Sequence, residues 1–209
     1  ATATTSHITD SGTLTITGES TFITRATGSN IELDTSDNAF ADAVTMKAET
    51  DGSEAFGNIT FVDSGAVDFD SSGSSDGDLN INASSTNGAV GGNLSITATT
   101  GNITQGIALA VTGTSSFTTS ANNTTITLSN TSNAFTGALT ITTNDDSNDR
   151  SYATIDGGTT ALIIATSTID GDLTLTSGHA SGITDTGNVT VAGNLVATTD
   201  ANSGVIDMG

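Results

Sequence analysis

The 209-residue chain contains no cysteine, no proline and no tryptophan, and it has a single tyrosine. Without cysteine it can form neither a disulfide framework nor a thiolate-ligated zinc site, and it has no thiol nucleophile. The absence of cysteine does not by itself fix the redox compartment. Without proline, the turns must be built from glycine, asparagine, aspartate and serine, which also favour turn conformations.

Basic residues are nearly absent as well. Arg25, Lys47 and Arg150 stand against 23 acidic residues, which gives a formal net charge of −20. This balance argues against nucleic acid as a partner and against an anionic membrane surface, because both require clustered Lys and Arg. It favours solubility and cationic partners such as calcium. The longest apolar run is far too short to cross a bilayer, so we expect no membrane insertion, and we find no signal peptide.

No segment shows an apolar stripe of helical period, so we expect essentially no helix. Short runs instead alternate an apolar residue with Thr, Ser, Asn or Asp, which is the pattern of half-buried strands. Gly, Asn, Asp and Ser clusters separate these runs. Among the runs are TLTITG at 13–18, NIEL at 30–33, NITF at 58–61, NLSITA at 93–98, ALTITT at 138–143 and NVTVAG at 188–193.

The stretch from Ala3 to Met46 recurs 95 residues later, from Ala98 to Ile141, with 19 of 44 positions identical and no gap. Nine apolar positions of the first copy fall on apolar positions of the second, which is the signature of a repeat array. The pairs are Ile8/Ile103, Leu14/Leu109, Ile16/Val111, Phe22/Phe117, Ile31/Ile126, Leu33/Leu128, Phe40/Phe135, Val44/Leu139 and Met46/Ile141.

The period continues beyond these stretches, since GDLNI at 77–81 matches GDLTL at 171–175. A shorter echo relates residues 8–18 to 183–193. No compositional break separates the halves. We therefore expect one continuous unit over 1–209, with super-repeat copies at about 1–95 and 96–209, as a piece of a longer chain.

Two all-β architectures compete: a tandem of β-sandwiches with about 95 residues each, and a parallel β-solenoid. The solenoid is favoured because few aromatic residues are present to fill a sandwich core. Polar residues also recur in register, Asn38 with Asn133 and Thr17 with Thr112, as ladders between coils would require. A coil of roughly 19–25 residues predicts four or five coils per super-repeat.

The order ITQ-x-x-ALAVTGTSSFTT (103–119), NNTTITLSNTSNAFTGALTITT (122–143), an acidic stretch and then STIDGDLTLTS (167–177) resembles the repeats of giant bacterial exoproteins. These are similar to filamentous haemagglutinin and other two-partner or autotransporter-type adhesins. The resemblance covers nearly the whole chain. It implies a right-handed parallel β-helix, export across the outer membrane, and a place in a secreted cell-surface fibre.

Candidate ligand residues are few. Asp68, Asp70, Asp76 and Asp78 form one acidic cluster, and Asp145, Asp146 and Asp149 form another. Such carboxylates could ligate Ca²⁺, although their spacing matches no established calcium loop, and solvated turns are the preferred interpretation. We therefore assign no catalytic, cofactor-binding or metal-ligating residue, and calcium is the single cofactor that the sequence leaves open.

Other candidates are weaker still. Asp145 and Asp146 invite comparison with the paired carboxylates of β-helix glycosidases, but the only histidines, His7 and His179, are far apart in sequence. Outward Thr arrays resemble an ice-binding face, yet Asp68 and Asn80 interrupt the series. We interpret both histidines as surface turn residues. The Asn-x-Thr sequons at Asn58, Asn102 and Asn188 are better explained as asparagine ladders at turns.

These observations favour a non-catalytic stalk or fibre segment of a secreted surface adhesin, continued by further coils or by copies stacked end to end. The alternative is a calcium-stabilised module that binds glycans or cells. A β-helix enzyme active on polysaccharides and an ice-binding solenoid are the less favoured alternatives.

Overall fold

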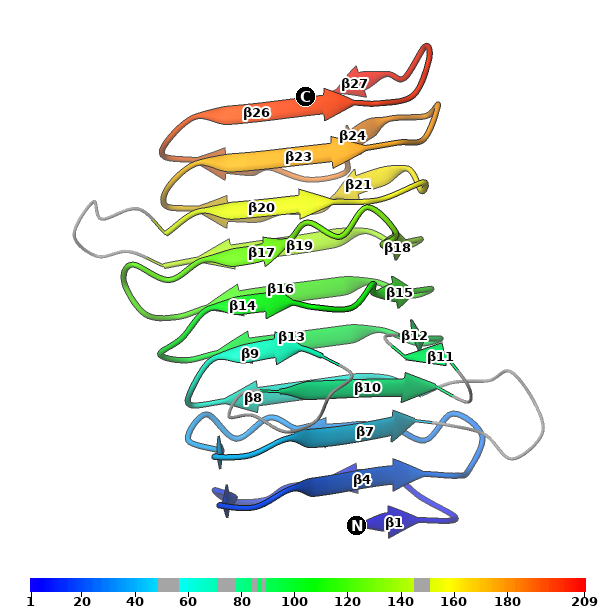
Figure 1. The fold of residues 1–209 in the computed structure, drawn as a ribbon, viewed down its shortest axis with the longest axis vertical. Coiled ribbons are helices and arrows are strands. Elements are labelled where there is room, and N and C mark those ends of the chain that lie inside the picture. Colours follow the sequence, from blue (N-terminus) through cyan, green and yellow to red (C-terminus); the bar gives the residue numbers. More distant parts are fainter. Residues whose placement is uncertain (49–56, 71–77, 84–85, 88, 145–150) are drawn as a thin grey trace.

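The computed structural model describes residues 1–48, 57–70, 78–83, 86–87, 89–144 and 151–209. Across these residues the chain winds into a β-solenoid without helices, and its strands stack in parallel (Figure 1). The front strands in Figure 1 run left to right while the chain climbs and returns behind them, so the coil is right-handed. No helix in the described residues is long and apolar enough to cross a membrane.

Two sheets form the front and the back of the solenoid. The front sheet contains β1 (Thr2–Ala3), β4 (Ser20–Thr24), β7 (Val44–Ala48), β10 (Leu79–Ala83), β9 (Val67–Phe69), β14 (Ile103–Gln105), β17 (Ile126–Leu128), β20 (Ala153–Asp156), β23 (Leu173–Ser177) and β26 (Leu195–Thr199). The back sheet contains β2 (Ile8–Thr9), β5 (Ile31–Leu33), β8 (Ile59–Asp63), β13 (Leu94–Ala98), β16 (Ser115–Thr119), β19 (Leu139–Thr143), β21 (Leu162–Ile164), β22 (Ser167–Ile169), β24 (Ile183–Asp185), β25 (Val189–Val191) and β27 (Ile206–Asp207).

Short strands line the two sides between these sheets. β3 (Thr15–Ile16) pairs with β6 (Ala39–Phe40), and β12 (Ala89–Val90), β15 (Ala110–Val111) and β18 (Ala134–Phe135) form a second side. β11 (Thr86–Asn87) pairs with β10, and this is the one antiparallel strand pair among the described residues. The parallel pairing excludes the β-sandwich alternative and confirms the solenoid prediction.

The core lies between the sheets and follows the predicted alternation. β7, β8, β13, β16, β19 and β23 each bury every second residue. All nine predicted apolar pairs belong to this core, and those of the first coil, such as Ile8 and Leu14, are partly buried. Phenylalanine rings stack between coils, with Phe117 lying 6.1 Å from both Phe69 and Phe135 between ring centroids. Edge-to-face contacts of this kind add to the stabilisation from burial.

Most coils have the predicted length, but the number of coils per super-repeat differs from the prediction. Residues paired on the back sheet are mostly 21 to 28 positions apart, as in Ile8–Ile31 and Ile31–Ile59, but Ile59 and Leu94 lie 35 apart. Three turns therefore separate Ile8 from Leu94, and Ile103 follows half a turn later on the front sheet. The super-repeat thus spans three and a half turns, and the expectation of four or five coils was wrong because one coil contains the extra strands β10–β12.

The half turn puts equivalent residues of the two copies on opposite sheets. β4 lies in the front sheet and its counterpart β16 in the back sheet. Asn38 and Asn133 are therefore not stacked on each other, nor are Thr17 and Thr112, contrary to the predicted ladders. Each asparagine instead makes the same contact in its own copy: Leu14 N donates to Asn38 Oδ1, and Leu109 N donates to Asn133 Oδ1, each at 2.8 Å.

Asparagine ladders do exist, at the residues that precede strands. Asn58 N donates to Asn30 Oδ1 at 3.0 Å, Asn93 N donates to Asn58 Oδ1, and Thr114 N donates to Asn93 Oδ1, each at 2.8 Å. Asn102 Oδ1 likewise accepts a hydrogen bond from Thr125 N. The ladder interpretation of the Asn58 and Asn102 sequons is therefore confirmed.

A third copy of the repeat begins at Ile183. Residues 183–208 match residues 8–33 at 9 of 26 positions. The backbone φ is positive at Gly28, Asn123 and Ser203, which occupy the same position of the three copies. This left-handed turn connects a five-residue strand to the next strand each time. The echo at 183–193 is therefore the start of a further repeat, again half a turn out of phase with the second.

Candidate cation site

The regular climb of the front sheet is broken at one place. The chain passes through β7, β8 and β9, and then β10 lies between β7 and β9 in the sheet, below the strand that precedes it in sequence (Figure 1). β10 pairs with β7 over three residues, but it meets β9 through a single parallel bridge, Asp68–Asp78. The ladder of backbone hydrogen bonds is therefore weak between β9 and β10.

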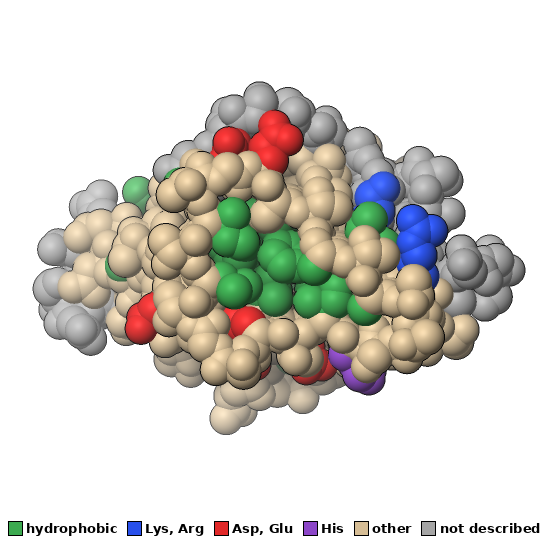
Figure 2. Space-filling model, turned by 90° about the horizontal axis from the view of Figure 1, so that it is seen from below, with side chains coloured by type: hydrophobic (Ala, Val, Ile, Leu, Met, Phe, Trp, Pro, Cys, Tyr) green, Lys and Arg blue, Asp and Glu red, His purple; other side chains and the backbone are tan. Residues whose placement is uncertain are grey.

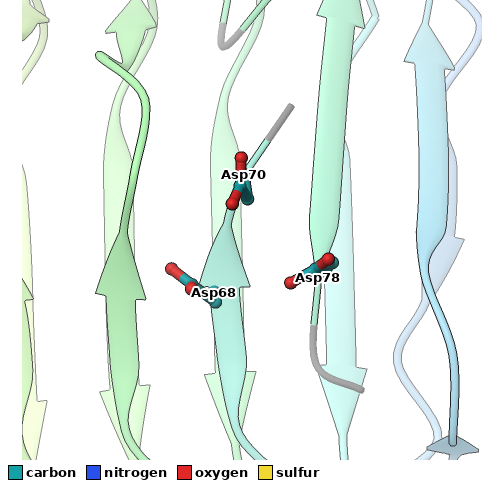
Figure 3. A group of neighbouring side chains, drawn as sticks. All are labelled: Asp68, Asp70 and Asp78. Carbon is teal, nitrogen blue, oxygen red and sulfur yellow. The ribbon is translucent and has the colours of Figure 1, made fainter. Parts of the chain in front are cut away.

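We call the junction of β9 and β10 the stacking fault, and three carboxylates lie there. Asp68 lies on β9, Asp70 follows β9, and Asp78 precedes β10 (Figure 3). One carboxylate oxygen from each lies within 4.8 Å of the other two, and Asp78 is buried. The predicted cluster is thus brought together, except for Asp76, which lies outside the described residues.

Two oxygen atoms near the fault have no hydrogen-bond partner among the described residues: Asp68 Oδ1 and Asn80 Oδ1, and both atoms are buried. A buried oxygen without a donor costs about 1–3 kcal/mol. Clustered carboxylate and amide oxygens are the ligands that calcium prefers, with water completing six to eight positions. Asp68, Asp70 and Asp78 therefore fit a hard divalent cation by chemistry.

Of the remaining predicted candidates, the structure describes only the two histidines. Asp145, Asp146 and Asp149 lie outside the described residues. His7 precedes a strand of the first coil, where its Nδ1 accepts a hydrogen bond from Asn30 N, and His179 Nδ1 accepts one from Ser181 N. Both histidines are exposed between strands, as predicted for surface residues: His7 precedes β2 and His179 follows β23.

The interruption of the front Thr series also lies at the fault. Asn80 pairs with Thr45, and Asp68 pairs with Thr104. The back sheet carries an uninterrupted outward rank, in which Thr97, Thr118 and Thr142 pair in sequence across three coils. The sequence analysis did not locate this rank because it did not assign strands to sheets.

A polar network that the sequence analysis missed surrounds Asp10. Partial burial disfavours the charged form, but hydrogen bonds from the Asn38 side chain and from the backbone N–H groups of Thr35 and Asp34 outweigh it. These bonds hold the pKa of Asp10 below its usual value. In the second copy a neutral residue, Gln105, makes the equivalent contacts with Asn133.

The sequence was compared with models of known protein families. A profile described as repeats of unknown function (DUF5649) matches residues 1–47, 56–142 and 151–208. The chain belongs to this DUF5649 repeat family. The two internal segments that the profile leaves out, 48–55 and 143–150, lie 95 residues apart, so they are the same variable position in two copies. No curated protein and no solved structure shows significant similarity to this DUF5649 repeat chain.

Proposed function

We propose that the chain is a non-catalytic structural segment of a rod, in which coils stack end to end to build an extracellular fibre. The solenoid architecture supports this role, because continuous strand ladders and a stacked apolar core resist bending and proteolysis. The resemblance to exoprotein repeats supports a secreted, cell-surface location. Filamentous haemagglutinin-like adhesins are the finer assignment that we propose on that resemblance.

The observation that carries the proposal is the exposure of core positions at both end coils. Ile206 is 48% exposed, whereas its counterparts Ile31 and Ile126 are fully buried. Leu195, which pairs with the buried Leu173, is 46% exposed, and the outward Val205 beside Ile206 is 51% exposed. At the other end, hydrophobic side chains gather in the middle of the first coil (Figure 2). The first and last coils also have unpaired strand edges at the two ends of the solenoid, and such edges are templates for further strands.

A further coil on these faces would stabilise the ends. Fully burying an aliphatic side chain contributes about 1.5–3 kcal/mol, so covering the exposed half of Leu195 and of Ile206 contributes about 2 kcal/mol in total. The contact is head to tail, and a head-to-tail contact that does not close gives a filament. Continuation of the polypeptide, or a second copy, supplies the covering coil.

Sedimentation and electron microscopy of residues 1–209 test the proposal. We expect concentration-dependent linear oligomers, which a Val205→Lys, Ile206→Lys double variant disrupts. Thr168→Lys, at an exposed position of the back sheet, is the matched control and leaves the oligomers intact. A monomer whose β26 and β27 amides resist hydrogen exchange as strongly as those of β16 would show capped ends and contradict the rod.

Calcium is a second candidate, favoured by the orphaned Asp68 Oδ1 beside Asp70 and Asp78. We propose that Ca²⁺ bridges β9 and β10 and stabilises the fault. Binding at ten times Kd contributes about 1.4 kcal/mol, so the melting temperature should rise with millimolar Ca²⁺ and fall with a chelator. Asp68→Asn, Asp78→Asn should abolish this response, and Asp200→Asn, far from the fault, should not. An unchanged melting temperature up to several millimolar Ca²⁺ rejects this candidate.

A further inference from the structure

A groove follows one corner of the front sheet, where three successive coils enter β20, β23 and β26. Its volume is about 700 Å³, within the range of small-molecule sites. Tyr152 lies at the lowest of the three coils, Asp172 at the middle coil and Asn194 at the highest. The outward Thr154 and Thr174 also line the groove. The groove lies on the C-terminal side of the stacking fault and shares none of its residues.

The first copy of the repeat has a different residue at the position of Tyr152. It immediately precedes β20, at the position where Asn58 precedes β8 in the first copy. Asn58 is a ladder residue whose Oδ1 bonds to the next coil. Tyr152 makes no such side-chain bond among the described residues, and the residue is 44% exposed. The only tyrosine of a chain without tryptophan therefore replaces a structural residue at a groove.

The polar groups beside the ring are fixed in place. Asp172 Oδ1 accepts hydrogen bonds from Asn194 N at 2.7 Å and from Asn194 Nδ2 at 3.1 Å. These bonds hold both side chains at the groove wall and do not use Asp172 Oδ2 or Asn194 Oδ1. Gly193 allows this approach, because a Cβ there would lie 2.4 Å from Asp172 Oδ1.

We propose that this groove binds a neutral saccharide chain along the side of the rod. An exposed aromatic ring offers a face for the C–H surface of a sugar. The carboxylate, amide and hydroxyl groups accept and donate hydrogen bonds to sugar hydroxyls. The two carboxylates at the groove, Asp170 and Asp172, repel sulfated and uronate glycans, and a chain of net charge −20 adds to that repulsion. The inference does not depend on rod assembly, since the groove is complete within one copy.

Tyr152 also provides the assay, because it is the only tyrosine or tryptophan fluorophore of the chain. Cellohexaose, maltohexaose, mannohexaose and chitohexaose are titrated against the monomeric Val205→Lys, Ile206→Lys variant, with hexagalacturonate as the acidic comparison. We expect a saturable change in tyrosine emission for at least one neutral chain, with a Kd of about 1 mM or lower, as suits a shallow groove. Hexagalacturonate should give no change.

Calorimetry of variants then locates the site. Tyr152→Ala should weaken binding at least tenfold, and Tyr152→Phe, which keeps the ring, should retain affinity within about threefold. Thr190→Ala, on the back sheet, should bind like the parent. Circular dichroism and melting should be unchanged in Tyr152→Ala, because the residue is half exposed. No saturation by any neutral chain at 10 mM or more, or equal binding by Tyr152→Ala, overturns the proposal.

Discussion

Replacing Phe117 by alanine tests the stacked core most sharply, because the repeat provides its own control. Phe117 is fully buried at the centre of the solenoid and contacts the rings of Phe69 and Phe135. Its counterpart Phe22, in the lower coils, is 7% exposed, and its ring centroid lies 6.2 Å from that of Phe40. The two substitutions delete the same atoms from different places in the stack.

The expected losses differ because of those surroundings. Phe→Ala in a core costs about 3–5 kcal/mol, and each ring pair contributes about 0.5–1.5 kcal/mol beyond burial. We therefore expect about 4–5 kcal/mol for Phe117→Ala and about 2–3 kcal/mol for Phe22→Ala. Each coil contacts only its neighbouring coils. A defect in a central coil therefore weakens the contacts to the coils on both sides, whereas a defect near the end destabilises only the few coils at that end.

Hydrogen exchange measured by mass spectrometry resolves this difference, since unfolding of a repeat array is not strictly two-state. In Phe117→Ala, amides of β13, β16 and β19 should lose about a thousandfold of their protection, because each 1.4 kcal/mol is a factor of ten. In Phe22→Ala the loss should be smaller and confined to β4 and β7. Equal losses, or a larger loss for Phe22→Ala, would refute the nearest-neighbour stacking of the core.

Three further predictions concern polar contacts and backbone packing. Asn133→Ala removes the donor to Gln105 Oε1 and Asp156 O, each at 3.0 Å, and the acceptor of Leu109 N. We expect the free energy of unfolding, measured by chemical denaturation, to fall by about 3 kcal/mol or more. The outward substitution Thr127→Ala should leave it almost unchanged. Because the pKa of Asp10 is lowered in the fold, its stabilisation is fully present above its unfolded value and is lost as pH falls through the lower folded value. Asp10→Gln places at this position the residue type of Gln105. Above about pH 5, the melting temperatures of parent and variant should therefore differ by a constant amount. In stronger acid the difference should shift in favour of the variant, and a constant difference down to pH 2 would contradict the network. Gly137→Ala places a Cβ 2.3 Å from Gly113 O, so the corner must open and the melting temperature should fall, whereas Gly12→Ala, with open space around it, should be neutral.

The strands and their buried residues could be predicted because alternation and the 95-residue recurrence both report side-chain direction. Phe40 and Phe135 are buried as their pairing requires. The same recurrence could not reveal how many turns it spans. That number depends on coil length, and the excursion of β10–β12 adds residues to one coil without adding a turn.

The sequence therefore could not show that the second copy is rotated by half a turn relative to the first. For the same reason it could not show on which sheet each residue lies. Asn38 and Asn133 were expected to stack because identical residues at a fixed spacing suggest a ladder. In the fold each bonds within its own copy, through Asp10 in one case and Gln105 in the other. The ladder asparagines, such as Asn58 and Asn93, are spaced by coil and not by super-repeat, so the 95-residue comparison does not align them.

The acidic cluster was identified from composition, but its position was not. Asp68 and Asp78 meet because β10 occupies the sheet below β9, and no local pattern signals a strand that stacks out of sequence order. The Tyr152 groove escaped notice for a related reason. Its residues come from three coils, and they become neighbours only when the coil length is known.

A distance measurement between spin labels tests the parallel stack most directly, and the absence of native cysteine allows clean labelling. Thr97→Cys and Thr190→Cys lie on one rank of the back sheet, linked through Thr118, Thr142 and Thr168 by four strand pairings. At about 4.8 Å per pairing, the backbone separation is about 19 Å, and the labels should give one narrow distribution near that value. A broad distribution, or a mean beyond about 30 Å, would contradict a solenoid that advances one strand per turn.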